Sequence, residues 1–315
     1  MTFKSLNNPF SIRQAFGKTI YTLAKTNKDI FVVSMDLKSA LYLDKFAKCF
    51  PKRFVEVGIA EANAAAIAAA LAKTGKTVFL CSFACFSPSI NWAVIRQSIC
   101  YNNLKVIIVG SHAGLMSGDL GASHQMLEDI ALMSTLPNME VFAPLDAYET
   151  QKIVTTVSHS HKSAYIRLVR PQTDNFLNSG SFTIGKSQIL KCGKDVTVIG
   201  YGPILSQAFE AQEELKDISL EIINCSSIKP LDVPAILKSV KKTGHLICIE
   251  DHQKNGGLGQ MIASLILEAN ISIKFIHLAV DNKFGQSAKN YQKLYDYYGI
   301  GTTALVAAIK KIYGK

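Results

Sequence analysis

The chain has 315 residues, of which 48% are hydrophobic and 18% are charged, and its formal net charge is +10. This composition is typical of a folded protein with a large core, and it excludes a disordered, collagen-like or low-complexity chain. At roughly 150 residues per domain, the length predicts about two domains. The positive charge suits anionic partners such as phosphorylated metabolites. Because no basic run is interleaved with aromatic residues, we expect no nucleic-acid partner.

Several features bear on where the protein acts. The alanine-rich run at residues 60–72 is short and contains Glu61 and Asn63, so it does not predict a membrane span. The first residues lack the apolar segment of a signal peptide. The seven cysteines form no Cys-x-x-Cys pair, which argues against a zinc or redox site. We therefore expect a cytoplasmic protein with reduced thiols, no membrane partner and no metal ligands of its own.

Short apolar, β-branched runs alternate with helical segments along the chain. Continuous apolar runs are typical of parallel strands that are buried on both faces. We expect strands at residues 31–35, 78–83, 106–110, 141–143, 165–169, 196–202, 220–225, 246–249 and 275–280. The expected helices are at residues 59–73, 92–101, 124–136, 147–160, 204–216 and 257–268. This alternation predicts an α/β fold with mostly parallel sheets flanked by helices.

A polar, turn-rich stretch at residues 171–181 shows no apolar periodicity. Such stretches separate domains, because they contain few residues able to pack into a core. We predict a first domain at residues 1–172, a linker at 173–183 and a second domain at 184–315.

Glu61 is a candidate functional residue because it begins a helix made almost entirely of small apolar residues. A carboxylate at a helix N-terminus is often purely structural, since it interacts favourably with the helix dipole. The alternative is a buried acid that exchanges a proton with a ligand. The residues around Glu61 leave both interpretations open.

The densest polar segment runs from residue 110 to 125 and contains four glycines as well as His112 and His124. It follows an expected strand, and α/β sheets bind ligands at the carboxyl ends of their strands. The glycines allow the backbone to approach a ligand closely. The two histidines are either structural residues or members of one site.

Two glycine-containing segments resemble phosphate loops only superficially. At residues 73–77 the P-loop pattern would need a glycine at position 70, which is alanine. At residues 256–259 the glycine spacing differs from a dinucleotide loop, and tight packing between strand and helix explains it as well. Three arginines, Arg13, Arg167 and Arg170, are candidate phosphate-binding residues or ordinary ion-pair residues.

Several motifs together resemble the transketolase family. They are the segments at residues 56–63, 82–86, 111–114, 121–125 and 136–138, and in the second domain those at 250–252 and 256–259. The resemblance covers nearly the whole chain. It corresponds to the C-terminal half of a full transketolase, which comprises a pyrimidine-binding domain and a C-terminal domain. The half that binds the diphosphate and its Mg²⁺ has no counterpart here.

The resemblance implies thiamine diphosphate as the cofactor, with the Mg²⁺ ligands on a separate N-terminal subunit. The family's glutamate, here Glu61, hydrogen-bonds a ring nitrogen of the cofactor and assists the proton transfer that activates it. Phe83 and Phe86 match aromatic residues that hold the pyrimidine ring. Asp36 matches an aspartate near the cofactor at the subunit interface.

For substrates, the resemblance implies sugar phosphates bound by His112, Arg170 and Arg13. His124 matches a histidine that contacts the donor's hydroxyl groups and belongs to the catalytic set. Two positions depart from the family: Ser89 replaces a tyrosine of the ring pocket, and Leu120 replaces an aspartate that binds an acceptor hydroxyl. Asp119, one residue earlier, is a possible substitute.

These residues predict the C-terminal subunit of a split transketolase, which transfers a two-carbon ketol unit from a ketose phosphate to an aldose. Family interfaces imply a heterotetramer with two copies of each chain. One alternative is the beta subunit of a 2-oxoacid dehydrogenase, which has the same two domains. A deoxyxylulose-phosphate synthase is a further relative, but it is normally a single long chain. The non-enzyme alternative is a regulatory or scaffolding subunit that has lost catalysis.

Overall fold

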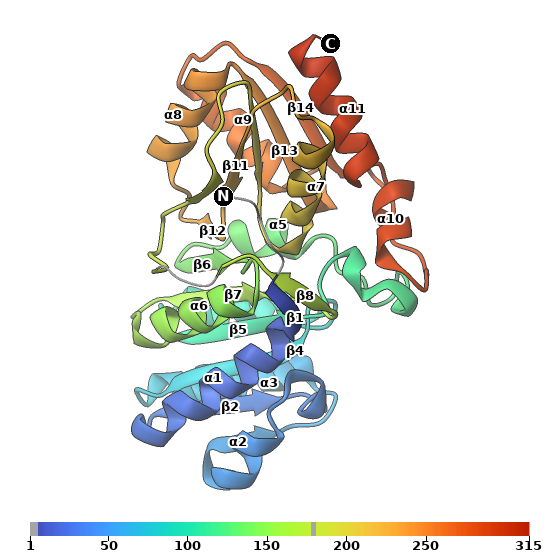
Figure 1. Ribbon diagram of the computed structural model, residues 1–315. Coiled ribbons are helices and arrows are strands. Elements are labelled where there is room, and N and C mark those ends of the chain that lie inside the picture. The colour runs from blue at the N-terminus through green and yellow to red at the C-terminus, as the bar shows by residue number, and fades with distance from the viewer. Residues whose placement is uncertain (1–5, 178–180, 315) are drawn as a thin grey trace.

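The computed structural model describes residues 6–177 and 181–314, which form two α/β units stacked one above the other (Figure 1). The strands are β1 (Leu6–Ser11), β2 (Ile30–Ser34), β3 (Phe54–Glu56), β4 (Thr77–Phe83), β5 (Val106–Ser111), β6 (Met139–Phe142), β7 (Ser163–Arg167), β8 (Gln172–Asn175), β9 (Gln188–Lys191), β10 (Val196–Gly200), β11 (Leu220–Asn224), β12 (Ser227–Lys229), β13 (His245–Gln253) and β14 (Lys274–Val280).

The α-helices are α1 (Ile12–Thr26), α2 (Asp44–Cys49), α3 (Glu61–Lys73), α4 (Trp92–Val94), α5 (Asp129–Ser134), α6 (Ala147–His159), α7 (Ser206–Glu214), α8 (Val233–Thr243), α9 (Leu258–Glu268), α10 (Tyr291–Tyr297) and α11 (Thr302–Tyr313). A π-helix, η3 (Ile95–Cys100), continues α4, and the short 3-10 helices are η1 (Ser39–Leu41), η2 (Pro51–Arg53), η4 (Leu115–Leu120) and η5 (Pro203–Leu205). Within the described ranges, no helix combines the length and the apolar character needed to cross a bilayer.

The first unit contains a seven-stranded sheet in the order β12-β6-β7-β5-β4-β2-β3, in which only β12 runs antiparallel to its neighbour. Helices α1 and α6 pack together on one face (Figure 1), and α3 and η3 contact each other on the other. Its central strands β4 and β5 are buried except at Phe83, the last residue of β4, since both faces are covered. This explains why these strands have continuous apolar sequences.

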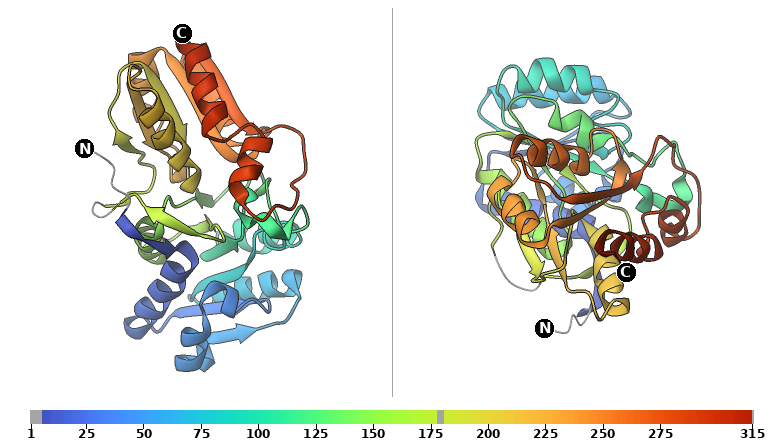
Figure 2. Two further views of the ribbon diagram at one scale, coloured as in Figure 1. Left: turned by 45° about the vertical axis from the view of Figure 1, so that its right-hand side comes forward. Right: turned by 90° about the horizontal axis from the view of Figure 1, so that it is seen from above.

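The second unit contains a five-stranded sheet in the order β14-β13-β10-β11-β9, in which β9 alone is antiparallel. Helices α7 and α11 cover one face, and α8 and α9 contribute to the core on the other (Figure 2). The predicted fold class, two mostly parallel sheets flanked by helices, is confirmed.

Two short strands differ from the sequence-based expectation. Strand β8 lies within the stretch at 171–181 that we expected to lack regular structure, and it pairs antiparallel with β1. Strand β12 belongs by sequence to the second domain, yet it extends the first sheet by pairing with β6. The predicted linker at 173–183 therefore begins inside a strand, and part of it, residues 178–180, lies outside the described residues. Short edge strands were missed because they contain few apolar residues.

The helix expected at residues 124–136 is shorter, because α5 begins at Asp129. The preceding residues make other contacts. The Gln125 side-chain amide donates to the Gly118 carbonyl oxygen (3.1 Å), and the Gly114 N–H donates to the Met126 carbonyl oxygen (2.8 Å). These contacts hold residues 124–128 as an irregular loop against the segment at 112–118.

Candidate functional site

Several of the candidate residues lie at one edge of the first sheet. Asp36 follows β2, Phe83 ends β4 and His112 follows β5. These strands are parallel neighbours, so their carboxyl ends meet at the same edge. This is where ligands bind in open α/β sheets.

Four aromatic rings form a compact cluster at this edge. The rings of Phe83 and Phe86 are stacked, with centroids 6.0 Å apart. The His112 ring lies 3.8 Å from Phe83, and the His124 ring lies 5.4 Å from Phe86. The sequence-predicted cofactor residues Phe83 and Phe86 and substrate residues His112 and His124 are therefore brought together. Phe83 and Phe86 stack, whereas the histidine rings meet them tilted or edge-on, as aromatic pairs commonly do.

His112 is held in an unusual conformation. Its φ angle is +59°, a left-handed backbone that non-glycine residues rarely adopt and that often marks a functional site. Its Nδ1 lies 3.0 Å from the Ser111 hydroxyl, and the side chain is buried. Burial, together with the positive charges of Arg13 and Arg170, lowers the His112 pKa to about 3. The imidazole is therefore neutral near pH 7 and acts as a hydrogen-bonding group rather than a cation.

Glu61 is the first residue of α3 and is 8% exposed. Among the described residues, no hydrogen bond or ion pair involves its carboxylate. The Asn91 side chain donates only to the Glu61 backbone carbonyl (3.0 Å). The negative charge of Glu61 contributes to the raised pKa of Cys85, to about 11, although burial of the thiol is the larger cause. Glu61 thus lies beside the segment that carries Phe83 and Phe86, with an acceptor available to a ligand.

Asp36 stands apart from the cluster. It is exposed at the end of β2, and its N–H donates to Glu56 Oε1 (2.8 Å). Its φ angle of +58° turns the chain at this point. Among the described residues, no hydrogen bond or ion pair connects the Asp36 carboxylate with Glu61 or with the histidines.

A basic pocket of about 390 Å³ lies next to His112 and includes Arg13 and Arg170. The Arg13 guanidinium donates to the carbonyl oxygens of Ala40 (2.6 Å) and Arg170 (2.8 and 3.1 Å), which fixes its position. The Arg170 side chain pairs with Asp119, whose pKa this contact lowers. Two arginines with one exposed carboxylate give the pocket a positive balance, which suits an anionic group.

The structure contradicts one alternative for Arg167. This residue is 4% exposed, and its guanidinium pairs with Asp129 (3.0 Å) and Asp251 (2.8 Å). It is a buried ion-pair residue between two carboxylates and does not line the basic pocket. Its partners lie 38 and 84 residues away in sequence, so no local pattern could reveal this.

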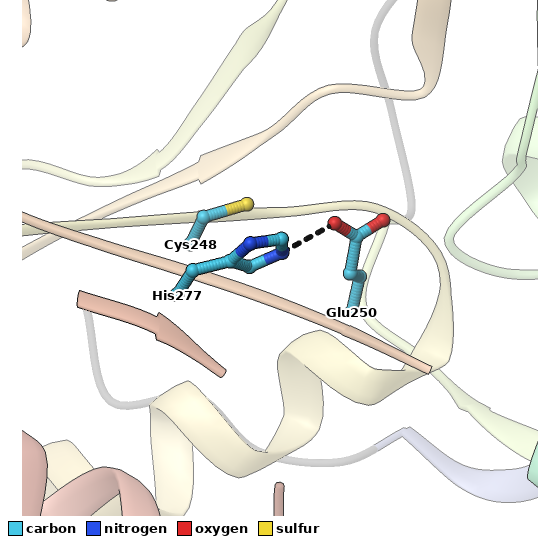
Figure 3. Close-up of side chains that lie close together, drawn as sticks. All are labelled: Cys248, Glu250 and His277. Carbon is cyan, nitrogen blue, oxygen red and sulfur yellow. Dashed lines mark hydrogen bonds and ion pairs between the residues drawn. The ribbon is translucent and has the colours of Figure 1, made fainter. Parts of the chain in front are cut away.

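A second cluster, Cys248, Glu250 and His277, has the residue types that bind metals (Figure 3). Both Glu250 oxygens already accept hydrogen bonds. His277 Nε2 (2.7 Å) and the Gly259 N–H donate to Oε1, and the Tyr201 hydroxyl and the Leu258 N–H donate to Oε2. Glu250 therefore anchors the start of α9.

The glycine segment at residues 256–259 has the packing role that its sequence allowed. A Cβ atom at Gly257 would lie 2.4 Å from Glu250 Oε1, and one at Gly259 would lie 2.4 Å from the His277 ring. The close approach of α9 to β13 and β14 requires glycine at both positions.

Sequence analysis missed two residues of the basic pocket. Lys289 and Tyr291 come from the second unit and line the pocket opposite Arg13 and Arg170. Figure 1 shows α10, which begins at Tyr291, at the margin of the second unit beside the segment that contains η4. Lys289 lies in an irregular segment without a motif, so only the folded arrangement identifies it.

Comparison with known proteins defines the class. The chain matches the family model for the transketolase pyrimidine-binding domain at residues 8–174 and that for the transketolase C-terminal domain at residues 185–305. The chain therefore belongs to the transketolase family, which implies thiamine diphosphate as cofactor.

The chain is similar over almost its full length to proteins described as sections or subunits of transketolases. It is 38% identical to a Methanocaldococcus jannaschii protein named as a transketolase C-terminal section, covering 95% of both chains. It is 34% identical to one of the subunits of the apulose-4-phosphate transketolase of Phocaeicola vulgatus, covering 93% of this chain and 95% of that one. A solved structure described as a split-gene transketolase, an inactive β4 tetramer, matches with a TM-score of 0.88 and 35% identity over 98% of this chain and 99% of that one. The expectation of a split transketolase C-terminal subunit is thereby confirmed.

Proposed function

We propose that this chain, together with an N-terminal subunit that binds the diphosphate and Mg²⁺, transfers a two-carbon ketol unit from a ketose phosphate to an aldose. The Glu61 carboxylate carries the proposal. It is 8% exposed at a helix N-terminus and lacks a protein hydrogen-bond partner among the described residues, so it is available to accept a hydrogen bond from a ligand. A protonated ring nitrogen of thiamine diphosphate is such a donor.

The bound cofactor supplies the nucleophilic carbon that takes up the ketol unit. Glu61 holds a proton at the ring nitrogen and so controls the protonation of the neighbouring amino group. Phe83 and Phe86 provide an apolar surface for the pyrimidine ring. Asp36 is proposed to contact the cofactor from the edge of β2.

The histidines and arginines are proposed to bind the sugar phosphate. His112 is neutral near pH 7 and lies between the aromatic cluster and the basic pocket, so it suits a hydroxyl or phosphate oxygen. Arg170 and Arg13 suit the phosphate. When substrate binds, its phosphate would replace Asp119 as the ion-pair partner of Arg170. His124 is proposed to contact hydroxyl groups of the donor and to assist proton transfer there.

Exposed apolar side chains beside Glu61 support the need for a partner subunit. Ile59 is 82% exposed and Ile90 is 63% exposed. Burying both against a second chain would remove apolar surface from water, which favours association. A related chain forms a tetramer described as inactive, which agrees with the proposal that this chain needs its partner and assembles as a heterotetramer.

The acceptor is left open by two departures from the family pattern. Leu120 cannot accept the hydrogen bond from an acceptor hydroxyl, and the neighbouring Asp119 is paired with Arg170. Ser89 donates to the Cys85 carbonyl oxygen and leaves more room than a tyrosine would. We propose an aldose acceptor other than the ordinary pentose phosphates. The reaction would take place in the cytoplasm, where the seven unpaired cysteines are stable.

The test uses the chain with a co-expressed N-terminal partner. Cofactor binding is measured by calorimetry, ketol transfer with a panel of ketose phosphates, and activation by exchange of the cofactor's reactive C–H with deuterium. We expect transfer by the complex and none by the chain alone. Glu61→Gln should abolish deuterium exchange, whereas Glu268→Gln, an exposed position on α9, should leave it unchanged.

Three results would contradict the proposal. Ketol transfer by the chain without a partner would exclude the split arrangement. Decarboxylation of 2-oxoacids without any use of ketose phosphates would favour the beta subunit of a 2-oxoacid dehydrogenase. A complex that binds no cofactor would instead support the scaffolding alternative.

A further inference from the structure

A buried group of charges lies between the two units. Arg167, at the end of β7, pairs with Asp129 of α5 on one side and with Asp251 of β13 on the other. Its Nε lies 3.0 Å from Asp129 Oδ2 and its Nη1 lies 2.8 Å from Asp251 Oδ1. Its Nη2 donates to the Asp251 carbonyl oxygen (3.0 Å). All three side chains are at most 4% exposed. A guanidinium satisfies both carboxylates at once only in a fixed geometry.

The surrounding tyrosines complete the group. The Tyr165 hydroxyl donates to Asp129 Oδ2 (2.7 Å), and the Tyr201 ring lies 5.7 Å from the Arg167 guanidinium. The Tyr201 hydroxyl in turn donates to Glu250. The hydrogen bonds therefore run from the first sheet into the core of the second unit. Removing one partner of such a group leaves an uncompensated buried charge, so the arrangement resists displacement.

This group lies directly beneath the loop that carries His112. A Cβ atom at Gly114 would lie 2.1 Å from Asp251 Oδ2 and 2.8 Å from Arg167 Nη2. Gly114 has a φ angle of +73° and follows His112 by two residues. The backbone thus rests on the Asp251–Arg167 pair on one side, while the His112 ring packs on Phe83 on the other.

We propose that Arg167 of the first unit and Asp251 of the second unit are positioning residues: together they hold the loop at residues 112–114 so that His112 meets the sugar phosphate. That Arg167 and Asp251 hold the loop is inferred from the geometry alone. That the loop in turn governs binding of the sugar phosphate rests on the proposed function. The second unit then has a direct part in substrate binding, although it supplies none of the residues assigned to the cofactor.

Asp251→Asn tests the proposal, because it keeps the side chain's shape and weakens the hold on Arg167. The first measurement is the titration of the His112 imidazole by NMR in the isolated chain, with His112→Asn identifying its signal. In the wild type His112 stays neutral down to about pH 4.5, since its pKa is about 3. In the variant we expect the pKa to rise by at least one unit, because the displaced ring becomes hydrated.

The direction of this shift excludes a direct charge effect. Removing the negative charge of Asp251 would lower a histidine pKa, so a rise reports movement of the loop. Glu221→Gln is the matched control. Glu221 is also buried and ion-paired, with Lys242, but within the second unit. An equal rise in this control would overturn the proposal, as would an unchanged His112 pKa in Asp251→Asn.

The second measurement is made on the complex with its partner subunit. For Asp251→Asn we expect the donor KM to increase about tenfold while cofactor affinity changes less than twofold. Arg167→Lys keeps the positive charge but loses the paired guanidinium donors. We expect it to raise the His112 pKa and the donor KM as Asp251→Asn does, but by smaller amounts, and it replaces Asp251→Asn as the test if that variant fails to fold. Equal losses of cofactor and donor binding would overturn the proposal. If the wild-type complex lacks ketol transfer, the proposed function fails, and the NMR titration decides the positioning separately.

Discussion

The buried His112 makes a specific contribution to the pH dependence of stability. Its pKa is about 3 in the folded chain, chiefly because of burial, against about 6.5 in an unfolded chain. Between these values the unfolded state binds a proton that the folded state does not, so stability falls as the pH decreases from 6.5 toward 3. Integrating this difference from pH 7 to pH 5 gives a loss of about 2 kcal/mol from His112 alone.

The perturbation that isolates this contribution is His112→Asn. Asparagine tolerates the left-handed backbone of this position and does not titrate. Urea unfolding, followed by the fluorescence of the single tryptophan Trp92, gives the free energy of unfolding at pH 7 and pH 5. The variant should lose about 2 kcal/mol less than the wild type over this interval.

The exposed His161 provides the control, and His161→Asn should retain the wild-type pH dependence. A loss of stability in His112→Asn as large as that of the wild type would refute the reasoning. It would mean that the imidazole is hydrated in the folded chain and is not enclosed by Phe83 and the neighbouring loop.

Three further outcomes are expected. Leu120→Asp should increase kcat/KM tenfold or more for aldose acceptors that have a free hydroxyl at the contacted carbon. If kcat/KM is unchanged for every acceptor tested, residue 120 does not determine acceptor specificity. Lys289→Ala should raise the donor KM about threefold, as suits an exposed charge, whereas Lys293→Ala should not. Burial raises the pKa of Glu149 to about 7. The contribution of Glu149 to the free energy of unfolding is therefore about 3 kcal/mol less favourable at pH 8 than at pH 4. Urea titrations should show the free energy of unfolding of Glu149→Gln rising by about 3 kcal/mol relative to the wild type between pH 4 and pH 8, since the opposite contribution of His112 is common to both proteins.

The sequence was sufficient to predict the core of the fold. Its nine apolar runs correspond to nine strands of the two sheets, because strands covered on both faces must be apolar throughout. The helix at residues 59–73 was recognised from its alanines, and Gly75 adopts the positive φ expected after its end. The edge strands β9 and β12 and the lysine-bearing helices α8 and α11 were missed, since their partial exposure interrupts the apolar runs.

The sequence motifs indicated residues that the fold brings together, and their roles stay predictions. Phe83, Phe86 and His112 lie at or just after the carboxyl ends of neighbouring strands, and His124 reaches the same cluster from the loop between η4 and α5. The role of Arg167 was not predictable. Whether a guanidinium binds a phosphate or a buried carboxylate depends on partners that only the folded chain brings into contact.

Strand β12 has a consequence for how the chain is made. The first sheet remains incomplete during synthesis until residues 227–229 emerge and pair with β6. Until then β6 presents an unpaired edge, which is the kind of surface through which nascent chains associate incorrectly. A fragment ending at residue 172 should keep this edge open and aggregate, whereas the full chain should unfold in one transition. The pairing of β12 with β6 would then make the folding of the first unit depend on a segment of the second.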